Sequence, residues 1–185
     1  GRALLVVLDR LEPAERVAFV LHDLFAVPFD EIASVLNRST PAAKKLASRA
    51  RHRVRGGSEV PTSALVEQRR VVDAFLAAAR GGDLDALLAV LAPDVVRRSD
   101  PAALPAGAPA ESRGARAVAG ETMVIGRRAR FAEAALVDGA VGALVAPGGR
   151  LRLVLTFGIV DGRIAVYQVI ADPTRLAQLT LAVLR

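Results

Sequence analysis

Seven basic side chains lie in the segment Arg38–Arg55, "RSTPAAKKLASRARHRVR", and no acidic residue interrupts them. The 185-residue chain has a net charge of +6, so the rest of it carries 6 − 7, or about one negative charge. Closely spaced cations of one sign bind polyanions, because neutralising phosphates releases their counterions. The segment therefore predicts a nucleic-acid contact.

A helix that begins near Thr40 would divide this segment into two faces. At 100° per residue, one side gathers apolar residues and the other gathers cations. The apolar side holds Ala43, Leu46, Ala47, Ala50 and Val54. The candidate DNA-contacting residues, the preceding turn included, are Arg38, Ser39, Thr40, Pro41, Lys44, Lys45, Ser48, Arg49, Arg51, His52 and Arg55. Those from Ser39 to Ser48 are placed to meet base edges, Arg49 onward would lie nearer phosphates, and Arg38 in the turn could serve either purpose.

The alternative is a solvated amphipathic helix with no ligand, which is the usual fate of a charged surface. Two features favour DNA. Solvated helical faces usually mix charges of both signs, because i to i+4 pairs of opposite charge are favourable. The short helix and three- to four-residue turn before the segment also have helix-turn-helix spacing, in which the second helix enters a major groove.

The residues before this helix show helical periodicity only. Apolar positions 4–8 predict a first helix, and Pro13 suits the first turn of a second. The second helix should pack through a stripe formed by Val17, Val20, Leu21 and Leu24. Pro28 opens a third, short helix that carries Ile32, Val35 and Leu36. Ser39 is then placed to cap the basic helix.

A composition change at "GGSEVPTS", residues 56–63, marks a domain boundary. We assign residues 1–55 to a helical domain, 56–64 to a linker and 65–185 to a second domain. In the second domain we expect helices at 65–80, 83–91, 114–128 and 173–184, and strands at 131–137, 140–146, 150–160 and 163–170. The segment 100–114, rich in proline, alanine and glycine, reads as a mobile loop.

The "DG" pairs at 138–139 and 161–162 favour tight hairpins, so the four strands should form an antiparallel meander. Helices grouped before a curved antiparallel sheet predict an α+β domain.

Several classes of chemistry are disfavoured by composition. The chain has no cysteine, which excludes disulfides and thiolate chemistry. His22 and His52 lack ligand-spaced partners, so neither a metal nor a cofactor is expected. No signal peptide or membrane-length apolar run is evident, so we expect a cytoplasmic protein without a membrane partner. Because the chain opens on Gly1, we also expect it to be part of a longer one.

The helical segment resembles a known family. "LEPAERVAFVLHDLFAVPFDEIASVLNRSTPAAKKLASRARHRV", residues 11–54, is similar to region 4 of bacterial extracytoplasmic-function (ECF) sigma factors. The resemblance implies that the basic helix binds the promoter −35 element and that the preceding helices contact the β-subunit flap of core RNA polymerase. Region 2, which contacts core polymerase and melts the −10 element, has no counterpart in the sequence. The chain alone is therefore not expected to initiate transcription.

Residues 65–185 resemble the SnoaL-like domain appended to one group of these sigma factors, a relative of nuclear transport factor 2. The similar motifs are "GGDLDALLAVLAPDVV", "GARAVAG", "LRLVLTFGIVDGRI" and "ADPTRLAQLTLAVL". In the family's closing Asn-Pro-Asp-Lys-Leu-like motif, the matching places are held by Asp172, Pro173, Arg175 and Leu176, with Asp172 in place of asparagine and Thr174 in place of aspartate. We expect this motif to be regulatory and to act on the helical domain in cis. A serine-aspartate-glycine motif is half present, as Ser99 and Asp100.

SnoaL-like domains are cones whose mouth can hold a small molecule, and free-standing relatives are cyclases and isomerases. An enzymatic alternative would use Asp94, Asp100, Glu121 or Tyr167 as acid-base groups. No motif brings two of them together, and Leu151, Leu153, Leu155, Phe157 and Ile159 should fill the core instead. We therefore expect a non-catalytic domain, with a small-molecule ligand left open. A third alternative is a degenerate factor that binds only protein partners.

Overall fold

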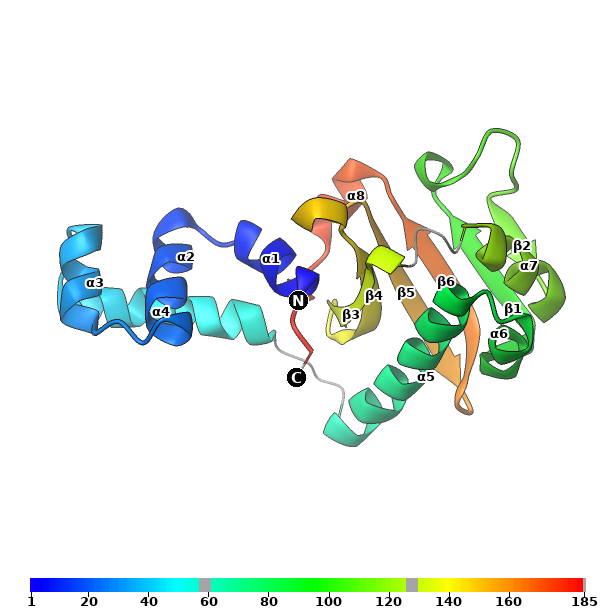
Figure 1. Cartoon of the computed structure of the whole chain (residues 1–185), viewed down its shortest axis with the longest axis horizontal. Helices are drawn as coiled ribbons and strands as arrows, with labels where there is room; N and C mark the ends of the chain where they lie inside the picture. Colours follow the sequence, from blue (N-terminus) through cyan, green and yellow to red (C-terminus); the bar gives the residue numbers. More distant parts are fainter. Residues whose placement is uncertain (57–60, 126–129, 185) are drawn as a thin grey trace.

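The computed structural model describes residues 1–56, 61–125 and 130–184, and it is elongated, with helices at one end and a sheet at the other (Figure 1). The helical module, residues 1–56, contains α1 (Arg2–Asp9), α2 (Pro13–Phe19), the π-helical turn η1 (Val20–Leu24), α3 (Phe29–Leu36) and α4 (Thr40–Arg55). Its small core consists of Ala18, Ile32, Ala33, Ala43 and Ala47. The helical prediction for this part is confirmed.

Local sequence explains where these helices begin and end. Pro13 occupies the first turn of α2, where its missing N–H costs nothing. Asn37 ends α3 in the left-handed conformation, with a φ of 50°. The predicted stripe of the second helix is partly wrong. Ala18 and Phe19 are buried, whereas Leu24 is 51% exposed, because the chain widens into a π-turn after Phe19 and rotates the later residues outward.

The sheet module, residues 61–125 and 130–184, begins with α5 (Thr62–Gly81) and α6 (Leu84–Val90). Its described strands form one sheet in the order β2-β1-β6-β5-β4-β3-β7. The remaining elements are β1 (Leu91–Ser99), η2 (Pro101–Ala103), β2 (Glu111–Arg113), α7 (Ala115–Ile125), β3 (Ala132–Val137), β4 (Ala140–Val145), η4 (Pro147–Gly149), β5 (Leu153–Val160), β6 (Arg163–Ile170), α8 (Pro173–Gln178) and β7 (Leu181–Ala182).

The predicted meander is confirmed for β3 to β6, which pair antiparallel in sequence order. Both hairpins turn on "DG", with positive φ at Asp138 and Gly139 and at Asp161 and Gly162. Two consecutive positive φ angles are those of a type I′ turn, which matches the twist of the strands. The α+β class is therefore correct.

Three strands lie where none was expected. β1 occupies residues 91–99 and pairs parallel with β6, so the sheet is not wholly antiparallel. β2 lies within the segment predicted as a mobile loop and pairs with β1. The predicted helix 173–184 is also wrong beyond Gln178, because Leu181 and Ala182 pair with the free edge of β3. Backbone hydrogen bonds to the otherwise unpaired edge of β3 outweigh the helical preference of these residues.

The two faces of the sheet pack against different helices. On β3, Leu136 packs with α5 and α6, whereas Ala135 and Val137 face the opposite way, as the two-residue strand period requires. That opposite face meets Val6 and Val7 of α1. The helical and sheet modules therefore share one apolar cluster.

Polar contacts fix α1 at both of its ends. The Glu133 carboxylate accepts hydrogen bonds from the backbone N–H groups of Arg2, at 2.6 Å, and Ala3, at 3.2 Å. At the other end, the Arg10 guanidinium donates to the carbonyl oxygens of Leu179, at 2.6 Å, and Leu176, at 2.7 Å. Burial lowers the pKa of Arg10, although nearby Asp138 opposes the shift. The modules are thus joined by directed bonds as well as by apolar packing.

The predicted linker 56–64 includes residues 57–60, and the predicted helix 114–128 includes 126–128; both stretches lie outside the described residues. Residues 62–64 belong to α5. Within the described ranges, no helix is long and apolar enough to cross a bilayer.

Candidate nucleic-acid interface and sheet cavity

The basic helix α4 has the two faces expected of it. Ala43, Ala47, Ala50 and Val54 are buried, and Leu46 is half-buried. The Ser39 side chain caps the helix by accepting from the Ala42 N–H at 3.4 Å, as predicted. Three alanines at helical spacing let α4 pack closely against α2 and α3, so its opposite face points away from the module.

Most of the candidate DNA-contacting side chains lie on that outward face. Thr40 and Arg51 are half-buried. The exposed ones are Arg38, Ser39, Pro41, Lys44, Lys45, Ser48, Arg49, His52 and Arg55. The Lys44 ammonium lies 5.9 Å from the centre of the Phe29 ring, a cation–π contact that orients it beside α3. The face is exposed and cationic, which is what a phosphate contact requires.

Two arginines of α4 are paired inside the helical module. Arg51 Nε lies 2.7 Å from Asp23 Oδ1, and Arg53 Nη1 lies 2.9 Å from Glu15 Oε2. Glu15 is buried, so its carboxylate depends on Arg53. The pairing partners lie on α2 and η1 and not on α4 itself, which is why the charge pattern of α4 alone did not reveal them.

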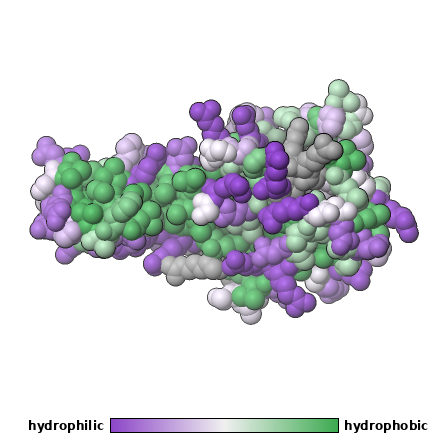
Figure 2. Space-filling view, in the orientation of Figure 1, coloured by the Kyte–Doolittle hydropathy of each residue, from purple (hydrophilic) through white to green (hydrophobic). Residues whose placement is uncertain are grey.

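Apolar side chains also gather on the surface of the helical end (Figure 2). Leu24 is 51% exposed, Phe25 is 71% exposed and Val35 is 67% exposed. These residues come from η1, the loop after it and α3, which precede the basic helix. A group of exposed apolar side chains on a small module is typical of a protein-binding surface.

The sheet module contains a partly open cavity of about 80 Å³, here called the sheet cavity. It is lined by Phe75, Leu76, Ala79, Arg97, Ser99, Ala103, Leu104, Thr122, Ala132, Val145, Leu153, Leu155, Tyr167 and Val169. As predicted, Leu153, Leu155, Phe157 and Ile159 pack against the core of the sheet module, and Leu153 and Leu155 also border this cavity. Leu151 packs instead against the cluster shared with α1.

The proposed acid-base groups do not meet in this cavity. Asp94 is exposed, and of the carboxylates Asp94, Asp100 and Glu121 none lines it. Tyr167 does line it, and burial raises the pKa of its hydroxyl to about 12, so it stays protonated at neutral pH. A phenol with such a pKa is a poor general base at neutral pH.

Asp100 is tied to α8. Its Oδ2 accepts from the backbone N–H groups of Ala171 and Asp172, each at 3.0 Å, and its Oδ1 pairs with Arg175. Burial acts to raise the pKa of Asp100, but these N–H bonds and Arg175 outweigh it and hold the pKa below its ordinary value. Asp100 is a structural anion that positions the start of α8.

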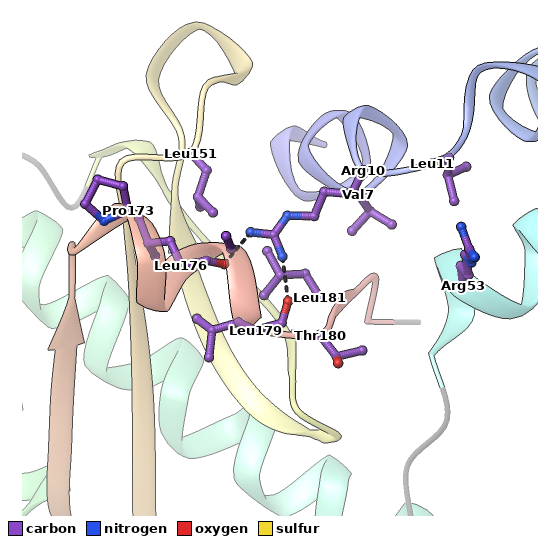
Figure 3. A pocket seen from close by; sticks show the side chains of 11 residues that line it. Val7, Arg10, Leu11, Arg53, Leu151, Pro173, Leu176, Leu179, Thr180 and Leu181 are labelled. Atoms are coloured by element: carbon purple, nitrogen blue, oxygen red, sulfur yellow. Dashed lines mark hydrogen bonds between the residues drawn. The ribbon is translucent and has the colours of Figure 1, made fainter.

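The predicted regulatory motif forms the start of α8. Asp172 caps the helix by accepting from the Arg175 N–H at 2.9 Å, and Pro173 occupies its first turn. Leu176 is buried, and its carbonyl receives Arg10. Figure 3 shows Arg10 reaching from α1 to the Leu176 and Leu179 carbonyls, beside a hollow of about 710 Å³ between the two modules. The motif therefore lies at the junction of the modules.

The histidines have separate surroundings. His22 stacks on Phe29, with ring centres 3.9 Å apart, and its Nδ1 lies 3.1 Å from the Val27 carbonyl oxygen. His52 is exposed on α4. Among the described residues, no three histidine, aspartate or glutamate side chains are grouped as metal ligands would be.

Comparison with known proteins identifies the helical module. Residues 1–54 match the family described as sigma-70, region 4. The probable ECF RNA polymerase sigma factor SigI of Mycobacterium tuberculosis is 44% identical over 99 residues, which are 53% of this chain and 34% of that protein. The ECF sigma factor SigJ of the same species is 48% identical over 102 residues, or 53% of this chain and 32% of that protein. The chain spans about a third of the length of these curated relatives.

Solved structures were also compared. The crystal structure of M. tuberculosis SigJ has 34% sequence identity and a TM-score of 0.49, covering 92% of this chain and 63% of that chain. A putative polyketide cyclase from Sinorhizobium meliloti has 30% identity and a TM-score of 0.41, covering 55% of this chain and 94% of that chain. The sequence matches therefore confirm the predicted resemblance to ECF sigma factors, and the helical module is similar to sigma-70 region 4.

Proposed function

We propose that the chain is the promoter-recognising and regulatory part of an ECF-type RNA polymerase sigma factor that acts in the cytoplasm. α4 binds the −35 element, and the sheet module controls the helical module in cis without catalysis. The observation that carries this proposal is the exposed cationic face of α4 in a region that matches sigma-70 region 4. Phosphates attract such a face from any DNA, and the N-terminal residues of α4 supply the sequence preference.

Lys44, Lys45 and Ser48 are the residues that read base edges in this proposal, because they are exposed near the N-terminus of α4. Arg49, His52 and Arg55 lie further along and contact phosphates. Arg51 is half-buried and shares its charge with Asp23, so it contributes less to DNA than its neighbours do.

Leu24, Phe25 and Val35 are the proposed contact with the β-subunit flap of core polymerase. They are exposed and apolar, and they come from the part of the module that precedes the basic helix. Replacing Phe25 with serine should weaken binding to the isolated flap while leaving DNA binding unchanged. Equal flap binding by Phe25→Ser would remove this part of the proposal.

The main test is selection of binding sites from duplexes with randomised positions, followed by fluorescence anisotropy on the selected duplex. Lys44→Ala and Lys45→Ala should each cost roughly 1–3 kcal/mol of binding free energy and change the selected sequence. Arg150→Ala, which removes an exposed charge from the sheet module, is the matched control and should bind normally. If neither lysine variant alters affinity or preference, α4 does not read DNA as proposed.

A further inference from the structure

The polar residues of the sheet cavity lie on neighbouring elements and not at random positions. Arg97 and Ser99 come from β1, Tyr167 from β6 and Thr122 from α7. On β1, the inward positions are Val95, Arg97 and Ser99, all buried. An arginine and a serine in the inward register of a buried strand are costly unless each polar group has a partner. Their hydrogen bonds therefore show which polar groups of the cavity wall still lack a partner.

Two hydroxyl groups in the cavity satisfy one another. The Thr122 hydroxyl donates its single proton to the Val118 carbonyl oxygen, at 2.7 Å. In the 2.8 Å contact between Thr122 and Tyr167, the tyrosine must therefore be the donor. Neither hydroxyl has a proton left to offer a ligand.

Two donors in the cavity wall remain without an acceptor, and one acceptor beside Arg97, Glu121 Oε2, is buried without a hydrogen bond. Arg97 is 2% exposed, and its Nε–H is buried with no hydrogen-bond partner in the described part of the chain. Ser99 Oγ accepts from Arg97 Nη1 at 2.8 Å, but the described residues give its own proton no acceptor. A buried donor without an acceptor costs free energy that a suitable ligand would recover.

The charge of the cavity is already balanced. Arg97 Nη2 lies 2.9 Å from Glu121 Oε2, and Ser112 Oγ donates to Glu121 Oε1 at 2.6 Å. Because the arginine has its own carboxylate, an anionic ligand would have no free counter-charge. A cationic ligand would face the guanidinium directly. Desolvation in an otherwise apolar cavity therefore disfavours both kinds of ion.

We propose that the sheet cavity is a sensor site for a small, uncharged, mostly apolar molecule carrying one hydrogen-bond acceptor, such as a carbonyl, directed at Ser99 and Arg97. A hollow of about 150 Å³ adjoins it and shares Arg97 and Leu104. Apart from Arg97 and Glu121, that hollow is lined by the apolar residues Leu104, Pro105, Ala108, Pro109 and Val124, and an apolar cavity of about this volume holds benzene. Leu104 borders both hollows, so its displacement admits a ligand up to the size of a substituted ring.

Ligand binding in the cavity would be transmitted to the regulatory motif. This inference therefore rests on the proposed cis control of the helical module. Ser99 precedes Asp100, whose carboxylate holds the N–H groups of Ala171 and Asp172 at the start of α8. At the other end of α8, the Leu176 carbonyl receives Arg10 of α1. A shift of Ser99 toward a ligand therefore acts on a continuous set of hydrogen bonds that ends in the helical module.

Binding can be tested on the whole chain by ligand-observed saturation-transfer NMR. The probes are cyclopentanone, cyclopentanecarboxylate and cyclopentylammonium, which share a ring and differ in charge. Cyclopentanone should bind at least about tenfold more tightly than either ion, because a charge buried without a partner costs more than one factor of ten. Ser99→Ala should weaken cyclopentanone at least threefold, and Ala79→Leu, which adds three carbons to the cavity wall, should abolish its signal.

Preferential binding of either ion would overturn the ligand class. A cyclopentanone signal that survives Ala79→Leu, in a variant shown to be folded by its circular dichroism spectrum, would place the ligand elsewhere. Absence of binding by all three probes to the wild-type chain would overturn the site itself.

Coupling can be tested by amide hydrogen exchange with and without cyclopentanone. The ligand should change protection at Ala171 and Asp172 in the wild-type chain and at the amides of Arg10 and Leu11 at the end of α1. Arg10→Ala should remove the effect on α1 and keep the effect on α8. If a chain that binds cyclopentanone shows no change in amide protection at α8, the proposed coupling through these hydrogen bonds is wrong. Promoter-DNA binding measured on the same samples tests the proposed function separately, since it requires no ligand.

Discussion

Individual residues of α4 differ in role although they share a charge. Arg53 and Arg55 are two positions apart and both are exposed, yet Arg53 pairs with buried Glu15, whereas Arg55 lies on the other side of the helix. Charge counting along the sequence treats them alike. We therefore expect Arg53 to contribute to stability and Arg55, under the proposed function, to DNA binding.

This difference yields a matched pair of predictions on DNA binding. Arg55→Ala should reduce the slope of log affinity against log salt by about one, because one phosphate contact is lost. Arg53→Ala should leave that slope unchanged and lower the free energy of unfolding by roughly 1–3 kcal/mol, since it strands the Glu15 carboxylate. Anisotropy titrations at several salt concentrations and urea unfolding measure the two effects. Identical slopes for both variants would contradict the division of roles.

Asp100 should make stability depend on pH in a defined direction. Its folded pKa lies below its ordinary value, so its stabilisation is fully present above the unfolded pKa of about 3.9 and is lost as pH falls through the lower folded value. Asp100→Asn should cost roughly 1.5–3 kcal/mol of unfolding free energy at pH 7, through weakened bonds to Ala171, Asp172 and Arg175. Urea unfolding of the wild-type and Asp100→Asn proteins from pH 7 to 2.5 should show that the difference between their unfolding free energies disappears below about pH 4. Asp94→Asn, at an exposed position, is the control, and a gap that is independent of pH would refute the assignment.

At the scale of elements, periodicity and turn chemistry predicted most of the fold. The basic helix, its Ser39 cap and the two "DG" hairpins followed from local rules, because capping and positive-φ turns depend on a few adjacent residues. β1 was missed because its inward positions include Arg97 and Ser99, which read as solvent-facing. Their burial depends on Glu121, a residue of α7 far along the chain.

The C-terminal segment was also mispredicted because its partners are distant in the sequence. Residues 179–184 have helical propensity, but the edge of β3 and the carbonyl of Val54 provide backbone partners that local sequence does not reveal. The exposed cationic face of α4 was predictable from the sequence, whereas the partners of Arg51 and Arg53 and the polar wall of the sheet cavity were not. Each of these depends on contacts between distant segments.

The alanine face of α4 supports a prediction at this scale. Ala47 is fully buried between α4 and the preceding helices, so Ala47→Leu must push them apart and should cost roughly 1–3 kcal/mol of unfolding free energy. Ser48→Ala, one residue along on the exposed face, should change stability by less than about 0.5 kcal/mol. Chemical unfolding followed by circular dichroism measures both. An Ala47→Leu protein as stable as Ser48→Ala would mean that α4 is not packed as described.

The whole molecule contains two modules with separate cores and one shared apolar cluster. Ile32 and Ala47 belong to the helical core, Phe75 and Leu87 to the sheet core, and Val6 to the cluster between them. Cooperative unfolding of the entire chain therefore depends on the cluster around α1. If the sheet module controls the helical module, the signal must cross this junction.

Val6 is 3% exposed in the shared cluster. Val6→Asp therefore buries a carboxylate among apolar side chains and adds no cation to pair with it. Burying that charge costs more than separating the modules, so α1 should leave the sheet while both remaining cores stay intact. We expect the wild-type chain to unfold in one calorimetric transition and the variant in two. Val35→Asp, at a position 67% exposed at the far end of the helical module, should keep a single transition. A single transition in Val6→Asp at nearly the wild-type midpoint would show that the cluster does not couple the modules, and control of DNA binding through α1 would then have no physical route.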